Sequence, residues 1–563
     1  MSTFAEAPLP LQPRSISNYN ALRVSCWLIA LVLGAAQAWA SRFTMNPDGV
    51  SYLDIGDAYW RGDWHNAINA YWSPLYSWIL GFFLKLFKPS PYWEYPLTHL
   101  VNFFGYVFAL VCFEFFLVYF TRDLQSRDRG LMRNEEAIPG YCWWLLGYSF
   151  FLSTSLLMIG LTLVTPDMYV AGFVYLASAL VLKIRSGAGP RISMALGAVL
   201  GLAYLSKTIM LPIGVVLFLA AFYRNPSRNA LKNATIAGVL FIGVASPFIA
   251  SLSRAERHLT FGEVGPIAYE EFVNGEEQFI PPEAGVLHPV RKLSETPTIH
   301  EFASPISGTY PIWYDPAYWH AGLKPYWDAG QQWHNAIRPA LDLYFRVLTT
   351  IQLNFVVPFL ALLLIATNPL GCCKRIFQYW SLLVPSVTAI VLYSLVYVES
   401  RYLGPFVLVL WMAGFSGLRF PNSVSMKKFL AFACAAIAAT SVLFIGNFVV
   451  QETIVGWTMA PAYSQAAQVL RQLGVKPGDR IAVFAIEPWG EGGSFVARLS
   501  RARIVAQCRV AGDWTGGVEG FARITSALRK EGTKLILIDK DPPANSTWVR
   551  LAQTRYYAYR LLP

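Results

Sequence analysis

Eleven apolar stretches, 15 to 24 residues long, divide this chain and limit what it can fold into. A segment within lipid must satisfy its own backbone hydrogen bonds, and an α-helix of about 20 residues does so while crossing the bilayer. Only 14% of the residues are charged, against about a quarter in soluble domains. The sequence therefore predicts a polytopic α-helical membrane protein, with spans near 21–40, 97–120, 140–162, 168–182, 192–206, 208–222, 234–252, 347–366, 379–398, 403–418 and 429–450.

Basic residues gather in alternate connections, those after the second, fourth, sixth, eighth and tenth spans. Examples are Arg122, Arg127, Lys183, Arg185, Arg224, Arg228, Lys374, Arg375, Lys427 and Lys428. The positive-inside rule makes these loops and the N-terminus cytoplasmic, and an odd number of spans then puts the C-terminus outside. We expect a multi-pass protein of the cell (inner) membrane. Because the net charge of +11 follows from these loops, no nucleic-acid partner is expected.

The spans divide the chain into a cytoplasmic tail (1–20), a membrane module (21–450) with outer loops 41–96 and 253–346, and a small extracytoplasmic α/β domain (451–563). The apolar stretch from Pro74 to Phe87 covers only about 21 Å as a helix, too little for a hydrocarbon core of about 30 Å. We interpret it as a juxtamembrane or re-entrant helix. An alternative for the first span is a signal peptide cleaved after Ala38-Trp39-Ala40.

Two acidic residues lie where the chain is expected to leave the membrane on the outer side. Asp48 follows the first span, and Asp167 lies at the turn between the third and fourth. The structural alternative for Asp48 is a helix N-cap within Asn46-Pro47-Asp48-Gly49, and Asp167 fits an ordinary helix start with Thr165 as N-cap and Pro166 at the first position. The functional alternative for Asp48 is a general base, because partial desolvation raises the pKa of a carboxyl.

Two basic residues lie on the same expected side. Lys207 interrupts an apolar stretch inside the outer leaflet, where an ammonium group must extend to the surface or meet an anion. Arg401 lies in a tight turn directly after Glu399 and Ser400, where an ion pair with Glu399 is the structural alternative. A phosphate on a lipid-linked substrate is the functional partner for both cations.

Aromatic side chains crowd both outer loops, among them Tyr52, Tyr71, Trp72, Trp313 and Trp319. Interfacial belts account for most such residues in membrane proteins. Stacking on sugar faces is the alternative for a few of them, and the sequence does not distinguish which.

These motifs together resemble the GT-C fold glycosyltransferases, which use polyprenyl-phosphate-linked sugars, and within them the protein O-mannosyltransferases and lipid A aminoarabinose transferases. The resemblance rests on Pro47-Asp48-Gly49 with Tyr52, Trp72-Ser73-Pro74-Leu75-Tyr76, Thr165-Pro166-Asp167, Leu205-Ser206-Lys207 and Arg401-Tyr402 with Pro405. The aminoarabinose transferases carry a Glu-Lys pair where this chain has Tyr71-Trp72-Ser73.

The resemblance implies transfer of a sugar from a polyprenyl-phosphate donor to a hydroxyl of a glycan, lipid or protein acceptor. Asp48 maps to the catalytic base, and Asp167 to an acid that shapes the site or binds a divalent metal ion. Lys207 and Arg401 map to donor-phosphate ligands, with Tyr52 and Tyr402 as further substrate-binding candidates. A multispan transporter or flippase, or an inactive sugar- or lipid-binding relative, are the alternatives that the sequence leaves open.

Overall fold

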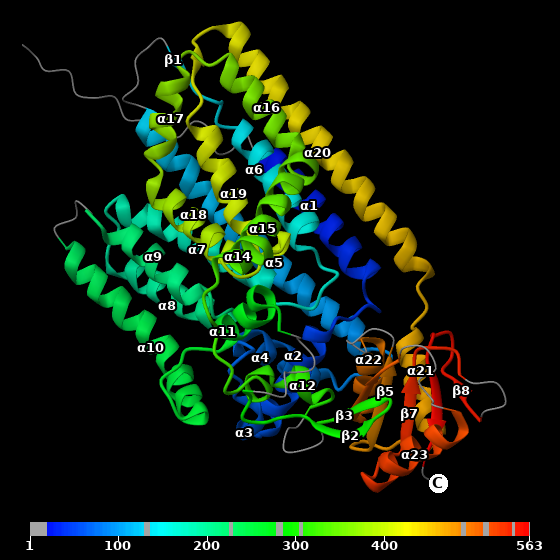
Figure 1. The fold of residues 1–563 in the computed structure, drawn as a ribbon. Helices are drawn as coiled ribbons and strands as arrows, with labels where there is room; N and C mark the ends of the chain where they lie inside the picture. Colours follow the sequence, from blue (N-terminus) through cyan, green and yellow to red (C-terminus); the bar gives the residue numbers. More distant parts are fainter. Residues whose placement is uncertain are drawn as a thin grey trace, which may run out of the picture.

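A computed structural model describes residues 20–128, 135–224, 229–276, 285–302, 308–485, 491–510, 517–542 and 547–561. Each of the eleven predicted spans is largely helical, and these helices form one elongated bundle (Figure 1). These are α1 (Asn20–Ala40), α5 (Glu94–Asp128), α6 (Cys142–Leu152) with its π-helical extension Ser153–Ile159, α7 (Asp167–Arg185), α8 (Pro190–Ser206), α9 (Met210–Phe222), α10 (Ala230–Glu256), α16 (Leu353–Leu364) after the π-helical Val347–Ile351, α18 (Trp380–Ser394), α19 (Ser400–Ser416) and α20 (Val424–Thr458). The predicted cytoplasmic tail lies almost wholly outside the described residues.

Among the described residues, six helices are long and apolar enough to cross a membrane, or eight if two bent pairs each count as one span. Both pairs bend by 82°: 329–351 with α16, and α17 (Pro369–Phe377) with α18. Helices α8 and α9 are shorter, at 17 and 13 residues. The chain is therefore a multi-pass membrane protein, and the count of eleven spans stays a prediction.

Connections predicted to share one side of the membrane meet in space. Strand β1 (Glu135–Glu136), after the second span, pairs with β4 (Phe420–Pro421), after the tenth. Arg375, after the eighth, forms an ion pair with Glu135 at 2.5 Å, and Lys427 one with Glu136 at 3.2 Å. This end of the bundle lies away from the β-sheet (Figure 1). The connections that carry Asp48, Asp167, Lys207 and Arg401 meet elsewhere, as the candidate site shows.

The two connections predicted to lie outside the membrane contain mostly short helices. The first loop forms α2 (Pro47–Arg61), α3 (Trp64–Ala67) and α4 (Pro74–Phe87). The large loop forms α11 (Val264–Tyr269), π-helical turns over Glu270–Asn274 and Gln332–Ile337, α12 (Pro311–Tyr314), α13 (Pro316–Trp319), α14 (Ala329–Gln331) and α15 (Arg338–Arg346). Helix α4 covers the same 14 residues that the sequence assigned to a juxtamembrane helix.

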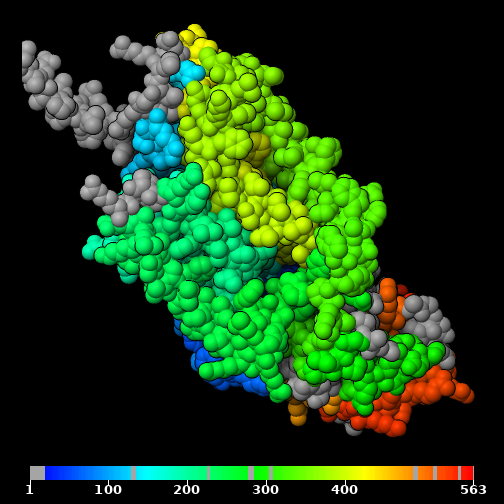
Figure 2. Space-filling model, turned by 60° about the vertical axis from the view of Figure 1, so that its left-hand side comes forward, coloured from blue at the N-terminus to red at the C-terminus, as the bar shows by residue number. Residues whose placement is uncertain are grey.

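A seven-stranded sheet joins the C-terminal region to the large loop, in the order β2-β3-β6-β5-β7-β9-β8. Its strands are β2 (Arg291–Glu295), β3 (Thr298–Glu301), β5 (Arg480–Ala485), β6 (Arg503–Arg509), β7 (Leu535–Ile538), β8 (Val549–Arg550) and β9 (Tyr557–Arg560), with helices α21 (Ala462–Gln472), α22 (Glu491–Ser500) and α23 (Gly517–Lys530). Strands β6, β5 and β7 are parallel. Antiparallel pairing of β3 with β6 brings the hairpin of the loop into the sheet, so the loop and the C-terminal region share one sheet. On the face drawn in Figure 2, green residues of the loop lie against the orange and red C-terminal region.

Helix α2, which carries Asp48, packs closely on α4 through two glycines. A Cβ atom on Gly56 would lie 2.7 Å from the Ser77 carbonyl oxygen, and one on Gly81 would lie 2.5 Å from the Gly56 oxygen. No side chain fits at such distances, so the two backbones approach one another only because both positions are glycine. This contact fixes the direction of α2 beneath the bundle.

A buried arginine attaches the C-terminal region to α2. The guanidinium of Arg498, on α22, lies 2.6 Å from Asp54, 2.8 Å from Asp57 and 2.7 Å from Glu94 at the start of α5. Asp54 also accepts a hydrogen bond from the Thr309 amide of the large loop, at 2.7 Å. One buried cation therefore holds the first loop, the bundle and the C-terminal region together.

Replacing Arg498 with methionine is expected to destabilise the protein by about 3–5 kcal/mol, because it leaves buried carboxylates without their cation. Arg501 is the matched control: it contacts Asp57 at 3.0 Å and Glu94 at 2.7 Å from a more exposed position. Arg501→Gln should therefore cost no more than about 1 kcal/mol. Thermal unfolding in detergent, followed through tryptophan fluorescence, measures the loss of stability of each variant. Equal losses of stability for the two variants would contradict the role of Arg498 as the buried cation that holds these segments together.

Candidate active site

Four connections converge beside the start of α2. The Asn46 side chain accepts a hydrogen bond from the Val164 amide at 2.8 Å, which ties the turn after α1 to the turn before α7. Asn46 thus bridges two loops instead of capping its own helix. Asp48, in the first turn of α2, and Asp167, at the start of α7, come together through this contact.

Arg401 joins the carboxylates of this site. Its guanidinium lies 3.9 Å from Asp48, 3.6 Å from Asp167 and 2.9 Å from Glu399. The ion pair with Glu399, which was the structural alternative, is therefore present, and it coexists with the two longer contacts. At separations of 3.6 and 3.9 Å the guanidinium attracts both aspartates without a close hydrogen bond to either.

Lys207 completes the cluster. Helix α8 ends at Ser206, and the Lys207 ammonium reaches the Asp167 carboxylate at 2.7 Å. The ammonium also lies 3.6 Å from the centre of the Tyr402 ring, a distance at which the ring face attracts a cation. Lys207 meets an anion and a ring face inside the protein rather than extending alone to the membrane surface.

Asp48 differs from Asp167 in its surroundings. Asp167 is 4% exposed and lies between two cations, whereas Asp48 is 24% exposed. One Asp48 oxygen accepts a hydrogen bond from the Trp313 indole at 3.2 Å. Burial raises the pKa of Asp48 above its ordinary value, although Arg401 and the Trp313 hydrogen bond oppose that shift. A carboxyl with a raised pKa, a cation close by and partial access has the properties of a general base.

The two tyrosine candidates line the same cluster. Tyr402 stacks on Tyr393 with ring centres 4.9 Å apart, and its hydroxyl accepts a hydrogen bond from Arg401 at 3.2 Å. Tyr52, one turn after Asp48, packs edge-on against Trp72 and is buried. Burial, and then the charges of Asp48 and Asp167, raise the pKa of Tyr52, so its hydroxyl stays protonated beside these acids. The structure thus brings all six predicted site residues together.

A metal ion does not fit these side chains as they stand. Asp167 is already ion-paired with Lys207, and Glu399 with Arg401. Within the part of the chain that the structure describes, no group of three His, Cys, Asp or Glu side chains is arranged to hold a metal ion. Lys207 and Arg401 are the two cations of the cluster, and each is paired with carboxylates of the protein itself.

Two residues of the site have roles that the sequence did not single out. Trp313 appeared only among many outer-loop aromatics, because nothing local marks the indole that reaches Asp48 from a helix 265 residues away. Its backbone carbonyl accepts hydrogen bonds from Ser51 at 2.8 Å and from the Trp72 indole at 3.0 Å. Glu399 was recognised as an ion-pair partner but not as a member of the cluster.

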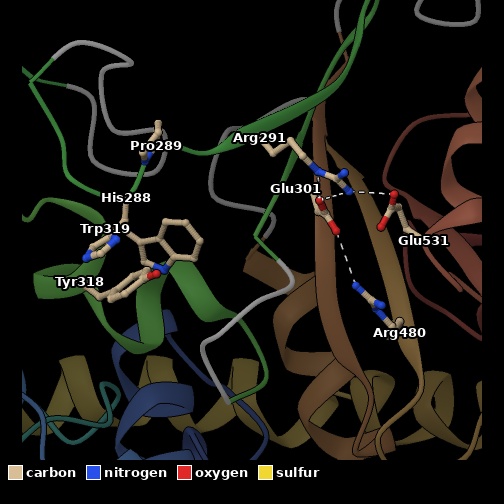
Figure 3. Close-up of a pocket in the computed structure, with 8 residues that line it drawn as sticks. All are labelled: His288, Pro289, Arg291, Glu301, Tyr318, Trp319, Arg480 and Glu531. Atoms are coloured by element: carbon tan, nitrogen blue, oxygen red, sulfur yellow. Dashed lines mark hydrogen bonds and ion pairs between the residues drawn. The ribbon is translucent and has the colours of Figure 1, made fainter.

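Apart from this cluster, a cavity of about 430 Å³ opens between the large loop and the sheet; we call it the second cavity. One wall is aromatic: the His288 ring stacks on the Tyr318 ring with their centres 3.9 Å apart, and Trp319 lies beside them (Figure 3). The opposite wall is an alternating chain of charges formed by Arg291, Glu301, Arg480 and Glu531 (Figure 3). Helix α13 supplies the aromatic wall, and α12 just before it supplies Trp313, so one loop segment contributes to both places.

No family model and no curated protein sequence matches this chain. Solved structures do match. The apo structure of ArnT from Cupriavidus metallidurans is 11% identical, over 95% of this chain and 97% of that one, with a TM-score of 0.51. The same protein bound to undecaprenyl phosphate is 11% identical over 97% and 98%, with a TM-score of 0.52. An oligosaccharyltransferase from Archaeoglobus fulgidus is 12% identical over 92% and 69%, with a TM-score of 0.49.

The fold is therefore that of the GT-C membrane glycosyltransferases, as the sequence resemblance implied, and the likeness to ArnT extends over nearly the full length of both chains.

Proposed function

We propose that this protein transfers a sugar from a polyprenyl-phosphate carrier to an acceptor hydroxyl at the outer face of the membrane. The observation that carries the proposal is the cluster in which Arg401 lies between Asp48 and Asp167 while Lys207 pairs with Asp167. A base next to Arg401, with Lys207 in the same cluster, suits a reaction that removes a proton and releases a phosphate. The fold shared with ArnT, whose structure includes bound undecaprenyl phosphate, supports a donor of this class.

In the proposed reaction, Asp48 accepts the proton of the acceptor hydroxyl as the oxygen attacks the anomeric carbon. The new bond joins that carbon to the acceptor oxygen, and the bond to the phosphate oxygen breaks with its electron pair on the phosphate. Lys207 and Arg401 stabilise the charge that develops on the leaving group. Attack opposite the leaving phosphate inverts the configuration of the sugar.

The charges of the site favour this assignment of roles. Three carboxylates face two cations. When Asp48 accepts the proton it becomes neutral, and the negative charge that it loses appears on the leaving phosphate, which Lys207 and Arg401 stabilise. Asp167 is the most buried acid and pairs with both cations, which suits a residue that orients them. Asp48 is more accessible than Asp167, which suits a residue that meets an acceptor.

For the arrangement in the membrane we propose a cytoplasmic N-terminus and an extracytoplasmic C-terminal region in the cell (inner) membrane, with 253–346 covering the site. Contact between Trp313 and Asp48 supports this role for the loop.

The aromatic and charged walls of the second cavity suit a saccharide, because rings stack on sugar faces and charged groups bind hydroxyls. We therefore assign the acceptor side of the reaction to the large loop.

Purified protein in proteoliposomes, supplied with polyprenyl-phosphate sugars and cell-envelope extract as acceptor, tests the proposal. We expect release of polyprenyl phosphate that depends on the acceptor, together with labelled sugar in the acceptor fraction. Movement of labelled lipid between leaflets without any sugar release would instead support a flippase. If neither sugar transfer nor lipid movement were observed with any donor tried, the proposed activity would be contradicted.

A further inference from the structure

A basic cavity of about 360 Å³ lies where the end of α2, the end of α4 and the turn after α22 meet. The side chains that line it include Asp57, Trp60, Arg61, Lys85, Lys88 and Arg501. It is distinct from the Asp48 cluster. Asp48 and Arg61 lie at opposite ends of α2, and 13 residues of helix separate them by about 20 Å.

The charge in this cavity is strongly unbalanced, with four cations facing one carboxylate. Arg501 is the cation that is neutralised, since it contacts Asp57 at 3.0 Å and Glu94 at 2.7 Å. For the other three cations, no carboxylate oxygen of the described chain lies within 4.0 Å. Lys85 is held in place by a hydrogen bond to the Trp60 carbonyl at 3.1 Å. The cavity therefore has room, and unsatisfied positive charge, for an anion.

An exposed apolar band begins at the rim of the cavity. Trp60, which lines it, contacts Phe82 with ring centres 5.6 Å apart. Beyond this pair, Leu86 and Phe87 at the end of α4 are 60% and 59% exposed. Phe83 continues the band by contacting Phe104 of α5 at 5.7 Å, and α5 leaves the residues Leu100, Phe104 and Val111 exposed along one face. Helical spacing of this kind on a membrane span marks a face that contacts lipid chains.

We propose that this cavity binds the phosphate of an anionic membrane lipid, whose acyl chains lie along the band formed by Phe82, Leu86 and Phe87. Lysine and arginine side chains recognise such a headgroup because their ammonium and guanidinium groups bind phosphate oxygens. The apolar surface next to them accommodates the acyl chains of the same lipid. A bilayer phospholipid and a phosphorylated glycolipid share this chemistry. Because Asp57 and Arg501 belong to the contacts that hold the C-terminal region on α2, the bound lipid stabilises that attachment.

The test is the thermal stability of delipidated full-length protein in detergent, titrated with phosphatidylglycerol or phosphatidylcholine. We expect the anionic lipid to raise the melting temperature and phosphatidylcholine to have little effect. In the double variant Lys85→Gln/Lys88→Gln, the concentration of phosphatidylglycerol needed for half of the effect should rise about tenfold or more, given the contribution of each lysine near a lipid surface. Both lysines are exposed, so the fold tolerates the change.

The double variant Lys324→Gln/Lys476→Gln is the matched control, since it removes two exposed lysines from the same predicted side of the protein. It should respond to phosphatidylglycerol as the unmodified protein does, and Arg61→Gln should weaken the response on its own. An unchanged response in Lys85→Gln/Lys88→Gln, or an equal loss in both double variants, would overturn the proposal. Stabilisation by inorganic phosphate at the same concentrations would overturn the lipid as ligand in favour of a soluble anion. None of these readouts depends on sugar transfer.

Discussion

Asp48→Asn is expected to reduce sugar transfer by about 10²–10⁴-fold, the contribution usual for a general base. The amide keeps the size of the side chain and still accepts the hydrogen bond from Trp313 through its oxygen, but it does not take up a proton from the acceptor. Turnover of labelled polyprenyl-phosphate sugar in proteoliposomes measures the loss. Binding of the donor should change far less, because Asp48 acts on the acceptor.

Asp328→Asn is the matched control for this variant. Asp328 caps the short helix α14 of the large loop and is exposed, so the same chemical change there should leave transfer intact. If Asp48→Asn retained more than about a tenth of the activity while folding normally, Asp48 would not be the base.

Arg401→Gln is expected to reduce transfer by a factor of about 10²–10³, as when a group that stabilises a transition-state charge is removed. The reason is twofold: the leaving phosphate loses a bidentate partner, and Asp48, Asp167 and Glu399 lose a shared cation. Arg401→Lys should recover only part of the activity, since an ammonium group lacks the forked geometry. Initial rates at several donor concentrations separate a loss of donor binding from a loss of turnover.

The double variant Glu399→Gln/Arg401→Gln distinguishes these two effects. It removes one negative and one positive charge together, so the charge balance of the cluster is kept while the phosphate ligand is absent. We expect it to fold more stably than Arg401→Gln and to remain inactive. Recovery of transfer in the double variant would mean that Arg401 only balances charge.

Local patterns were sufficient to predict the parts of the site that lie at helix ends. Pro47 and Pro166 mark the starts of helices, and the alternation of basic loops groups connections by side. A lysine inside an apolar stretch must either extend to the membrane surface or meet an anion. Together these features predicted that Asp48, Asp167, Lys207 and Arg401 share one place. The helix from Pro74 to Phe87 followed from its length alone.

Contacts between distant segments were not predictable in the same way. Nothing near Trp313 marks it as the hydrogen-bond donor to Asp48, since that contact depends on how α12 lies on α2. Pairing of β3 with β6 is likewise a long-range event between strands about 200 residues apart in the sequence, and strand pattern alone does not choose a partner. Nothing in the sequence around Arg498 marks it as a buried cation, because Glu94 and Asp54, which pair with it, lie 404 and 444 residues away in the chain.

The proposed active site is tested most directly by a structure of the protein in lipid nanodiscs with undecaprenyl phosphate bound. We expect the phosphate within about 3 Å of the Lys207 ammonium or the Arg401 guanidinium, with Asp48 on the acceptor side of the same site. A phosphate bound away from both cations, or Asp48 separated from it by packed protein, would rule out the proposed reaction.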